Sequence, residues 1–177
     1  MSTSLFFWGQ GSEWFWVMVQ SIIVIFTLWF IYRQIKLSRY ANMLQTILKF
    51  REIWDSKEMM DLRQATCKNY KNKTRGIGKA EGRVLGFFEE MGILVGKGVI
   101  SKEFAWEGYS YYIEPYRAMM EKKIREFREQ ENDESWFDHF EKLRDAMEKY
   151  SKKKKARSGP LKEKDIERFI IGELERI

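Results

Sequence analysis

The chain has 177 residues, and its 32 Lys and Arg outnumber its 26 Asp and Glu, which gives a net charge of +6. Because it contains only two prolines and is rich in Glu, Lys, Met and Leu, the composition favours an all-α fold over a β-sheet domain. One cysteine, Cys67, and one histidine exclude an intrachain disulfide and a zinc site built from several such ligands. We therefore expect no metal and no cofactor.

The first segment, residues 1–13, is expected to form a short external tail. Its apolar group from Leu5 to Trp8 suits the lipid headgroup region, and Gly9 and Gly11 suit a turn. A disordered tail is the alternative. In a ring of subunits, such tails could line or narrow the external mouth.

Residues 14–32, WFWVMVQSIIVIFTLWFIY, contain no charge, Gly or Pro. A helix of this length spans roughly 29 Å, close to the hydrocarbon thickness of a bilayer. Trp14 and Trp16 at one end, with Trp29 and Tyr32 at the other, are typical of interfacial aromatic belts. A buried core helix is the alternative, but such a helix rarely lacks a polar face over five turns. The sequence therefore predicts a transmembrane helix.

A narrow polar stripe follows this helix, because Glu13, Gln20, Thr27 and Gln34 are seven residues apart. A glutamine that faces lipid is costly, so the stripe is expected to face protein or water. It could form a seam between helices or line a pore in a ring of identical helices. A lone anchor that tolerates these polar residues is the third interpretation.

The charge distribution predicts the orientation of the span. Residues 1–32 contain no Lys or Arg, whereas Arg33, Lys36 and Arg39 follow directly. The positive-inside rule places the N-terminus outside and the rest of the chain in the cytoplasm. A cleaved signal peptide is not expected, because a basic first region and a small-residue cleavage site are both missing.

Residues 33–150 are expected to form a cytosolic helical domain, because apolar residues recur there at helical spacing. The membrane helix is expected to continue into this domain, with a break near Asp55, where Ser56 can cap a second helix that runs to about residue 70. Further helices are predicted over residues 79–95, 101–130 and 135–150.

Three sequence features predict how these helices pack and where one of them bends. Gly82 and Gly86 lie one turn apart and would permit a close helix approach. Pro115 is expected to interrupt and kink its helix. The many aromatic residues are assigned to the core, with a base-stacking platform as the alternative.

The loop of residues 68–78, KNYKNKTRGIG, is basic and could hold a phosphate. It lacks the spacing of a nucleotide-hydrolase phosphate loop, and no strand precedes it, so we favour a solvated loop.

Residues 151–164 are expected to form a basic linker, and residues 165–177 a terminal amphipathic helix that could dock on a neighbouring subunit. The linker could bind RNA phosphates or anionic lipid headgroups, although a purely solvated linker is the alternative. Its candidate binding residues are Lys152, Lys153, Lys154, Lys155 and Arg157.

The FFEEMG segment beginning at Phe87, the aromatic helix after it and the closing SWFDHFEKL segment resemble the soluble half of a bacterial family of unknown function with one N-terminal span. The resemblance covers roughly residues 36–150. Size, layout and basic tail also resemble the small membrane accessory proteins of type VI-B CRISPR systems. This resemblance implies a bacterial inner-membrane homo-oligomer that acts beside an RNA-guided RNA nuclease, and a diverged HEPN ribonuclease fold.

Active HEPN members carry an Arg, four to six residues and then a His. Here the nearest Arg before His139 is Arg128, eleven positions earlier, so the motif is absent as spelled. One His and a displaced Arg supply no convincing acid and base pair.

Three functions therefore remain open at this point. The favoured one is an oligomeric membrane pore or membrane-perturbing effector in CRISPR-linked antiphage defence. The second is a membrane-tethered ribonuclease that uses Arg128 and His139. The third is a passive membrane scaffold that recruits a partner.

Overall fold

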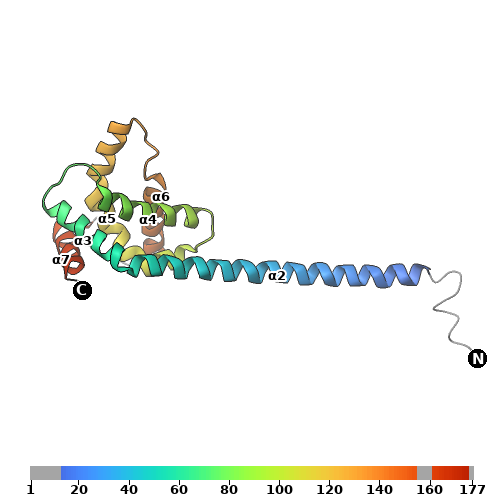
Figure 1. Ribbon diagram of the computed structural model, residues 1–177. Coiled ribbons are helices and arrows are strands. Elements are labelled where there is room, and N and C mark those ends of the chain that lie inside the picture. The colour runs from blue at the N-terminus through green and yellow to red at the C-terminus, as the bar shows by residue number, and fades with distance from the viewer. Residues whose placement is uncertain (1–12, 155–160, 176–177) are drawn as a thin grey trace, which may run out of the picture. The chain divides into compact units, whose positions relative to one another are not determined.

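The computed structural model describes residues 13–154 and 161–175. The predicted external tail, except Glu13, and part of the basic linker lie outside the described residues. Within the described part the chain is all-helical, which confirms the all-α prediction of a long apolar helix followed by a helical bundle (Figure 1). The helices are α2 (Glu13–Asp55), α3 (Lys57–Lys71), α4 (Lys79–Gly96), α5 (Lys102–Glu131), α6 (Asp138–Lys153) and α7 (Glu163–Leu174).

The chain divides into two compact units, Met1–Gln45 and Thr46–Ile177. In the first unit, helix α2 is long and apolar enough to cross a membrane, and no part of its apolar window is buried. A helix in the core of a water-soluble domain would bury that window, so the core-helix alternative does not fit this chain.

Serine caps define two helix starts in the second unit. Helix α2 ends at Asp55, and the Ser56 hydroxyl then accepts a hydrogen bond from the Met59 backbone N–H at 3.2 Å. The Ser101 hydroxyl accepts from the Phe104 N–H at 3.1 Å in the same way. Both caps satisfy backbone donors that the first helical turn leaves free. The predicted break after Asp55 is thus confirmed.

An aromatic cluster forms the centre of the bundle. The Trp54 ring lies 4.7 Å from Phe87, 5.2 Å from Phe88 and 4.8 Å from Tyr112, measured between centroids. Phe88 also stacks on Phe140 at 5.2 Å. Trp54, Phe87, Phe88 and Phe140 are buried, so these rings are core residues rather than a platform for bases.

The closest helix approach occurs at Gly92, where α4 meets the start of α6. A Cβ atom at Gly92 would lie 2.2 Å from the His139 carbonyl oxygen, so only glycine fits. The predicted approach at Gly82 and Gly86 is wrong. A Cβ at Gly82 would meet its nearest neighbour, the Ile77 side chain, at 3.8 Å, and one at Gly86 would meet nothing within 4 Å.

Helix α5 continues through Pro115, so the predicted interruption is also wrong. The proline ring is buried within the bundle, and this packing offsets the backbone hydrogen bond that proline cannot donate.

The terminal helix α7 packs on α3 and α5 of its own chain (Figure 1). Its Phe169 and Ile170 are buried, and Phe169 lies 5.2 Å from the Tyr116 ring. The apolar side that the sequence left without a partner is therefore covered within the chain.

Replacing Gly92 by Ala is expected to lower the free energy of unfolding by about 1 to 3 kcal/mol, because α4 and α6 must separate to admit the methyl group. Gly86→Ala is the matched control. It adds a methyl group to the same helix in open space and should be neutral or stabilising by up to about 1 kcal/mol. Urea unfolding followed by tryptophan fluorescence measures both. Equal effects of the two substitutions would contradict the packing described.

Candidate functional site

The polar stripe lies on helix α2 as the spacing predicts. Glu13, Gln20, Thr27 and Gln34 are all exposed in the single chain. Their seven-residue spacing keeps them on one side of the helix, with a slow drift around its axis.

The polar groups of the stripe differ in how they are satisfied. The Thr27 hydroxyl donates to the Ile23 carbonyl oxygen at 2.8 Å, and neighbouring Ser21 donates to Val17 in the same manner. Such bonds within one helix lower the cost of placing a hydroxyl in lipid. Gln20 has no such partner among the described residues. Its amide is therefore the group in the apolar stretch that most requires a neighbour from another molecule or water.

Aromatic residues mark both ends of the apolar stretch, and Trp14, Trp29 and Tyr32 are exposed. The Arg33 guanidinium carbon lies 5.4 Å from the centroid of the Trp29 ring, a cation–π distance. A cation held against an aromatic ring suits the boundary between hydrocarbon and headgroups.

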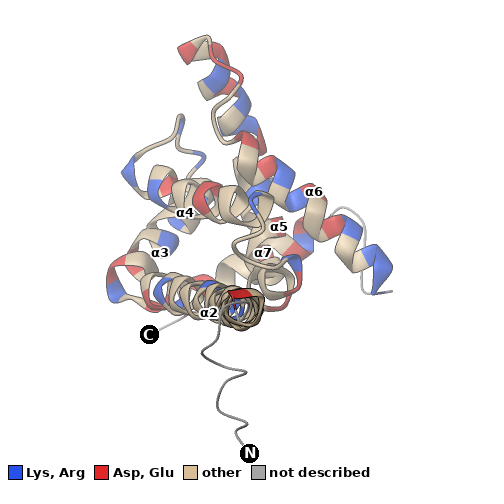
Figure 2. Ribbon diagram, turned by 90° about the vertical axis from the view of Figure 1, so that its right-hand side faces the viewer, with Lys and Arg blue, Asp and Glu red and all other residues tan. Residues whose placement is uncertain are grey.

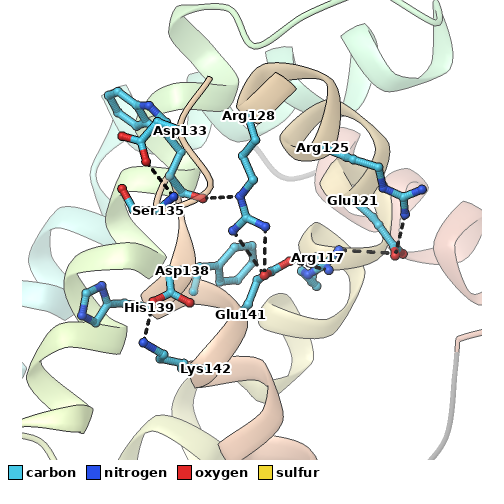
Figure 3. A network of polar contacts seen from close by, with 12 residues as sticks. Arg117, Glu121, Arg125, Arg128, Asp133, Ser135, Asp138, His139, Glu141 and Lys142 are labelled. Carbon is cyan, nitrogen blue, oxygen red and sulfur yellow. Dashed lines mark hydrogen bonds and ion pairs between the residues drawn. The ribbon is translucent and has the colours of Figure 1, made fainter. Parts of the chain in front are cut away.

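The two ribonuclease candidates do not share a site (Figure 3). Arg128 donates from Nε to the Trp136 carbonyl oxygen at 2.9 Å and from both terminal nitrogens to Glu141 at 3.2 Å. Glu141 also accepts from Arg117 at 2.7 Å. The guanidinium of Arg128 is therefore occupied in joining α5 to α6.

His139 has a different partner, Glu89 on α4. The Glu89 carboxylate lies 2.9 Å from the His139 ring Nδ1 and accepts from the backbone N–H groups of His139 at 3.2 Å and Phe140 at 2.7 Å. Figure 3 shows the His139 ring pointing away from the guanidinium of Arg128. Glu89 caps the N-terminus of α6, where a negative charge is stabilised by the helix dipole.

The described part of the basic linker is largely engaged within the chain. Lys152 pairs with Glu148 at 2.8 Å, and Lys154 approaches Glu103 at 3.5 Å. The nearby Tyr150 and then the hydrogen bond to Glu103 raise the pKa of Lys154. Lys153 is exposed. Two further candidates for anion binding, Lys155 and Arg157, lie outside the described residues.

A buried ion pair that the sequence did not reveal joins α3 to α7. Arg63 Nε lies 3.2 Å from Glu173 Oε2, and both side chains are almost fully buried. The Tyr116 hydroxyl donates to the same oxygen at 3.1 Å, and the Arg63 guanidinium carbon lies 4.3 Å from the Trp54 ring centroid. The sequence did contain one sign of this ion pair, because Glu173 is a charged residue within the otherwise apolar face of the terminal helix.

Burial beside this ion pair also determines the protonation state of Cys67. Burial, with a further contribution from the charge of Glu173, raises the pKa of the Cys67 thiol to about 12. Burial likewise raises the pKa of Tyr116. Cys67 is consequently a neutral core thiol near pH 7 and not a nucleophile. Across the described residues, no group of three or more His, Cys, Asp and Glu could hold a metal ion.

A second buried carboxylate, Glu81, joins three segments. It accepts from Lys123 at 2.7 Å, from Asn69 at 3.2 Å and from the Gly78 backbone N–H at 3.1 Å. Burial acts to raise the pKa of Glu81, but the hydrogen bonds and the charge of Lys123 together outweigh it and hold this pKa below its ordinary value.

Replacing Glu81 by Gln is expected to lower the free energy of unfolding at pH 7 by about 3 kcal/mol, because Lys123 would remain buried without its counter-ion. The lowered pKa of Glu81 means that the folded state gains this stability above the ordinary pKa of 4.5 and loses it as the pH falls further. The difference between wild type and Glu81→Gln should therefore shrink from pH 5 towards pH 3 in urea unfolding. Exposed Glu90, on the same helix, provides the control Glu90→Gln. A difference that grows on acidification would contradict the assignment.

Replacing Glu89 by Ala is expected to cost about 1 to 2 kcal/mol of stability, since two backbone N–H groups of α6 lose their cap. His139→Ala should cost less, because it removes one side-chain contact and leaves both backbone bonds in place. Thermal unfolding of the two variants compares them directly. A larger loss for His139→Ala would show that the cap is not what Glu89 contributes.

The family model described as "Domain of unknown function (DUF4760)" matches residues 17–147. The match begins within the apolar part of α2 and ends in α6, so it includes Gln20 and Thr27 but not α7. No curated protein and no solved structure matches the chain significantly. Because the matched segment covers most of the sequence, the chain belongs to the DUF4760 family.

Proposed function

We propose that this chain is a single-span membrane protein that assembles with copies of itself into a pore or a membrane-perturbing effector. It would lie in the bacterial inner membrane with its N-terminus outside and its helical bundle in the cytoplasm. One observation carries the proposal, namely that Gln20 is an exposed amide within an apolar helix and has no partner among the described residues.

The energetics favour self-association over a lone anchor. An amide without hydrogen bonds costs several kcal/mol in hydrocarbon. Identical parallel helices bring identical side chains to the same depth, so each Gln20 could bond to the Gln20 of the next subunit. Bonds of this kind contribute about 0.6 to 2 kcal/mol each between membrane helices. In a ring with a lumen, water would satisfy the remaining amide groups.

The stripe supports a pore in particular, because its polar residues extend along the full span. Glu13 and Gln34 lie at the two ends, with Gln20 and Thr27 between them. A lumen lined in this way would let ions move down existing gradients, so no bond would be made or broken. Contacts between the helical bundles would set the number of subunits, and the bundles would also hold the gate of the pore.

The biological setting follows from the resemblance to accessory proteins of type VI-B CRISPR systems. Such a pore would enhance antiphage defence beside an RNA-guided RNA nuclease. A membrane-tethered ribonuclease receives less support, because Arg128 and His139 contact different partners. A passive scaffold is likewise less supported, because the described linker cations Lys152 and Lys154 already have acidic neighbours.

The double substitution Gln20→Leu and Thr27→Leu is expected to abolish ion flux in liposomes, because both polar groups that could face a lumen would be lost. Ile25→Leu, on the opposite side of the same helix, is the matched control and should retain flux. Chemical cross-linking of the same samples reports assembly, which the bundle is expected to preserve in both variants. Unchanged flux in the double variant would reject the lining role, and a wild type that neither conducts nor cross-links would favour the passive scaffold.

A further inference from the structure

A pocket of about 970 Å³ opens in the helical bundle. Its walls come from the end of α3 and the loop that follows it, the second half of α5, and α7. This volume lies at the upper end of the range for small-molecule sites in proteins.

The floor of the pocket is apolar. Met119 of α5 and Ile166 and Ile170 of α7 line it, and Met119 and Ile170 are buried. Tyr70, at the end of α3, adds a partly buried aromatic ring. A ligand that covers this floor therefore needs an apolar or planar body as well as charge.

One wall of the pocket is cationic. Lys71, Lys73 and Arg75 line it, and Figure 2 shows the basic residues along this loop. No acidic side chain in the described part of the chain pairs with any of these three. Because ammonium and guanidinium groups bind phosphate oxygens through charge-assisted hydrogen bonds, this wall suits a phosphate group.

The cationic loop is anchored at both ends. The backbone N–H groups of Lys73 and Thr74 donate to the Tyr70 and Asn69 carbonyl oxygens at 3.0 Å each. At the far end, the Gly78 N–H donates to the buried Glu81 carboxylate. The backbone that carries these cations is thus held in place before any ligand arrives, which lowers the entropy that the loop loses on binding.

The part of the lining that α7 contributes is acidic. Glu163 and Glu167 of α7 line the pocket, and neither carboxylate pairs with a cation in the described part of the chain. Glu126, the third acid of the lining, lies 3.7 Å from Lys122. Positive and negative groups therefore face the same apolar floor without neutralising one another.

We propose that this pocket binds a phosphate ester that carries an amine. The phosphate would contact Lys71, Lys73 and Arg75, the amine would donate to Glu163 and Glu167, and the body between them would cover the apolar floor. Two sources share this chemistry, an aminophospholipid headgroup and a free phosphate ester that carries an amino group, such as a nucleotide. Either ligand would join α7 to the loop and so stabilise the bundle.

Calorimetric titration of the full chain in detergent tests the proposal with four water-soluble probes. Adenosine monophosphate represents the free source and glycerophosphoethanolamine the lipid source. Glycerol 3-phosphate and inorganic phosphate lack the amine. We expect one of the two amine-bearing probes to bind saturably, at least about tenfold more tightly than glycerol 3-phosphate. The tighter of the two identifies the source.

Two sets of substitutions measure the contributions of the cationic and the acidic residues to binding separately. The triple variant Lys71→Ala, Lys73→Ala and Arg75→Ala should weaken every probe by about tenfold or more. The control Lys57→Ala, Lys68→Ala and Lys102→Ala removes the same charge from exposed positions outside the pocket and should bind as wild type does.

The acidic wall gives the sharper test. Glu163→Gln with Glu167→Gln should reduce the amine-bearing probe to the affinity of glycerol 3-phosphate and leave inorganic phosphate unchanged. Thermal unfolding without ligand checks that each variant is folded. Absence of saturable binding by both amine-bearing probes, equal affinity for glycerol 3-phosphate, or indifference to both sets of substitutions would overturn the proposal. These outcomes are independent of ion flux and assembly.

Discussion

The rest of the structure depends on one constraint, namely that the described residues place no protein surface over the apolar part of α2. None of the side chains in its apolar window is buried, and most are exposed. Burial of apolar area stabilises by about 25 cal/mol per Å², so hydrocarbon around this helix would be more favourable than water. In hydrocarbon, a hydroxyl that is already hydrogen-bonded, as at Thr27, costs little free energy. An amide without a hydrogen-bond partner, as at Gln20, costs several kcal/mol. The helix that is long and apolar enough to cross a membrane is thus also the helix on which we propose that self-association depends.

The helical bundle is organised by a few carboxylates, two of them buried and one partly buried, each of which serves several donors. Glu81 joins α3, α4 and α5, and Glu173 joins α7 to α3 and α5. Glu89 joins α4 to the first turn of α6. Removing one partner of such a group leaves a charge or a backbone donor unsatisfied, so these contacts fix the register of the helices more strictly than apolar packing alone.

Local signals in the sequence predicted the helices well, because serine caps and helical spacing act over a few residues. Ser56 and Ser101 both cap helices in the structure. Contacts between distant segments were harder to predict. Gly82 and Gly86 had the expected spacing, but the close approach is at Gly92, since that position depends on where α6 crosses α4. The pocket was equally hidden, because its cations and its carboxylates lie about ninety residues apart in the chain.

The mass of the full chain in detergent, measured by light scattering with the detergent contribution subtracted, tests the central claim most directly. Each chain contributes 21.4 kDa. The account predicts a single closed assembly larger than a dimer that requires detergent to stay in solution. A 21.4 kDa monomer in detergent, or a protein that stays in solution without detergent, would contradict it.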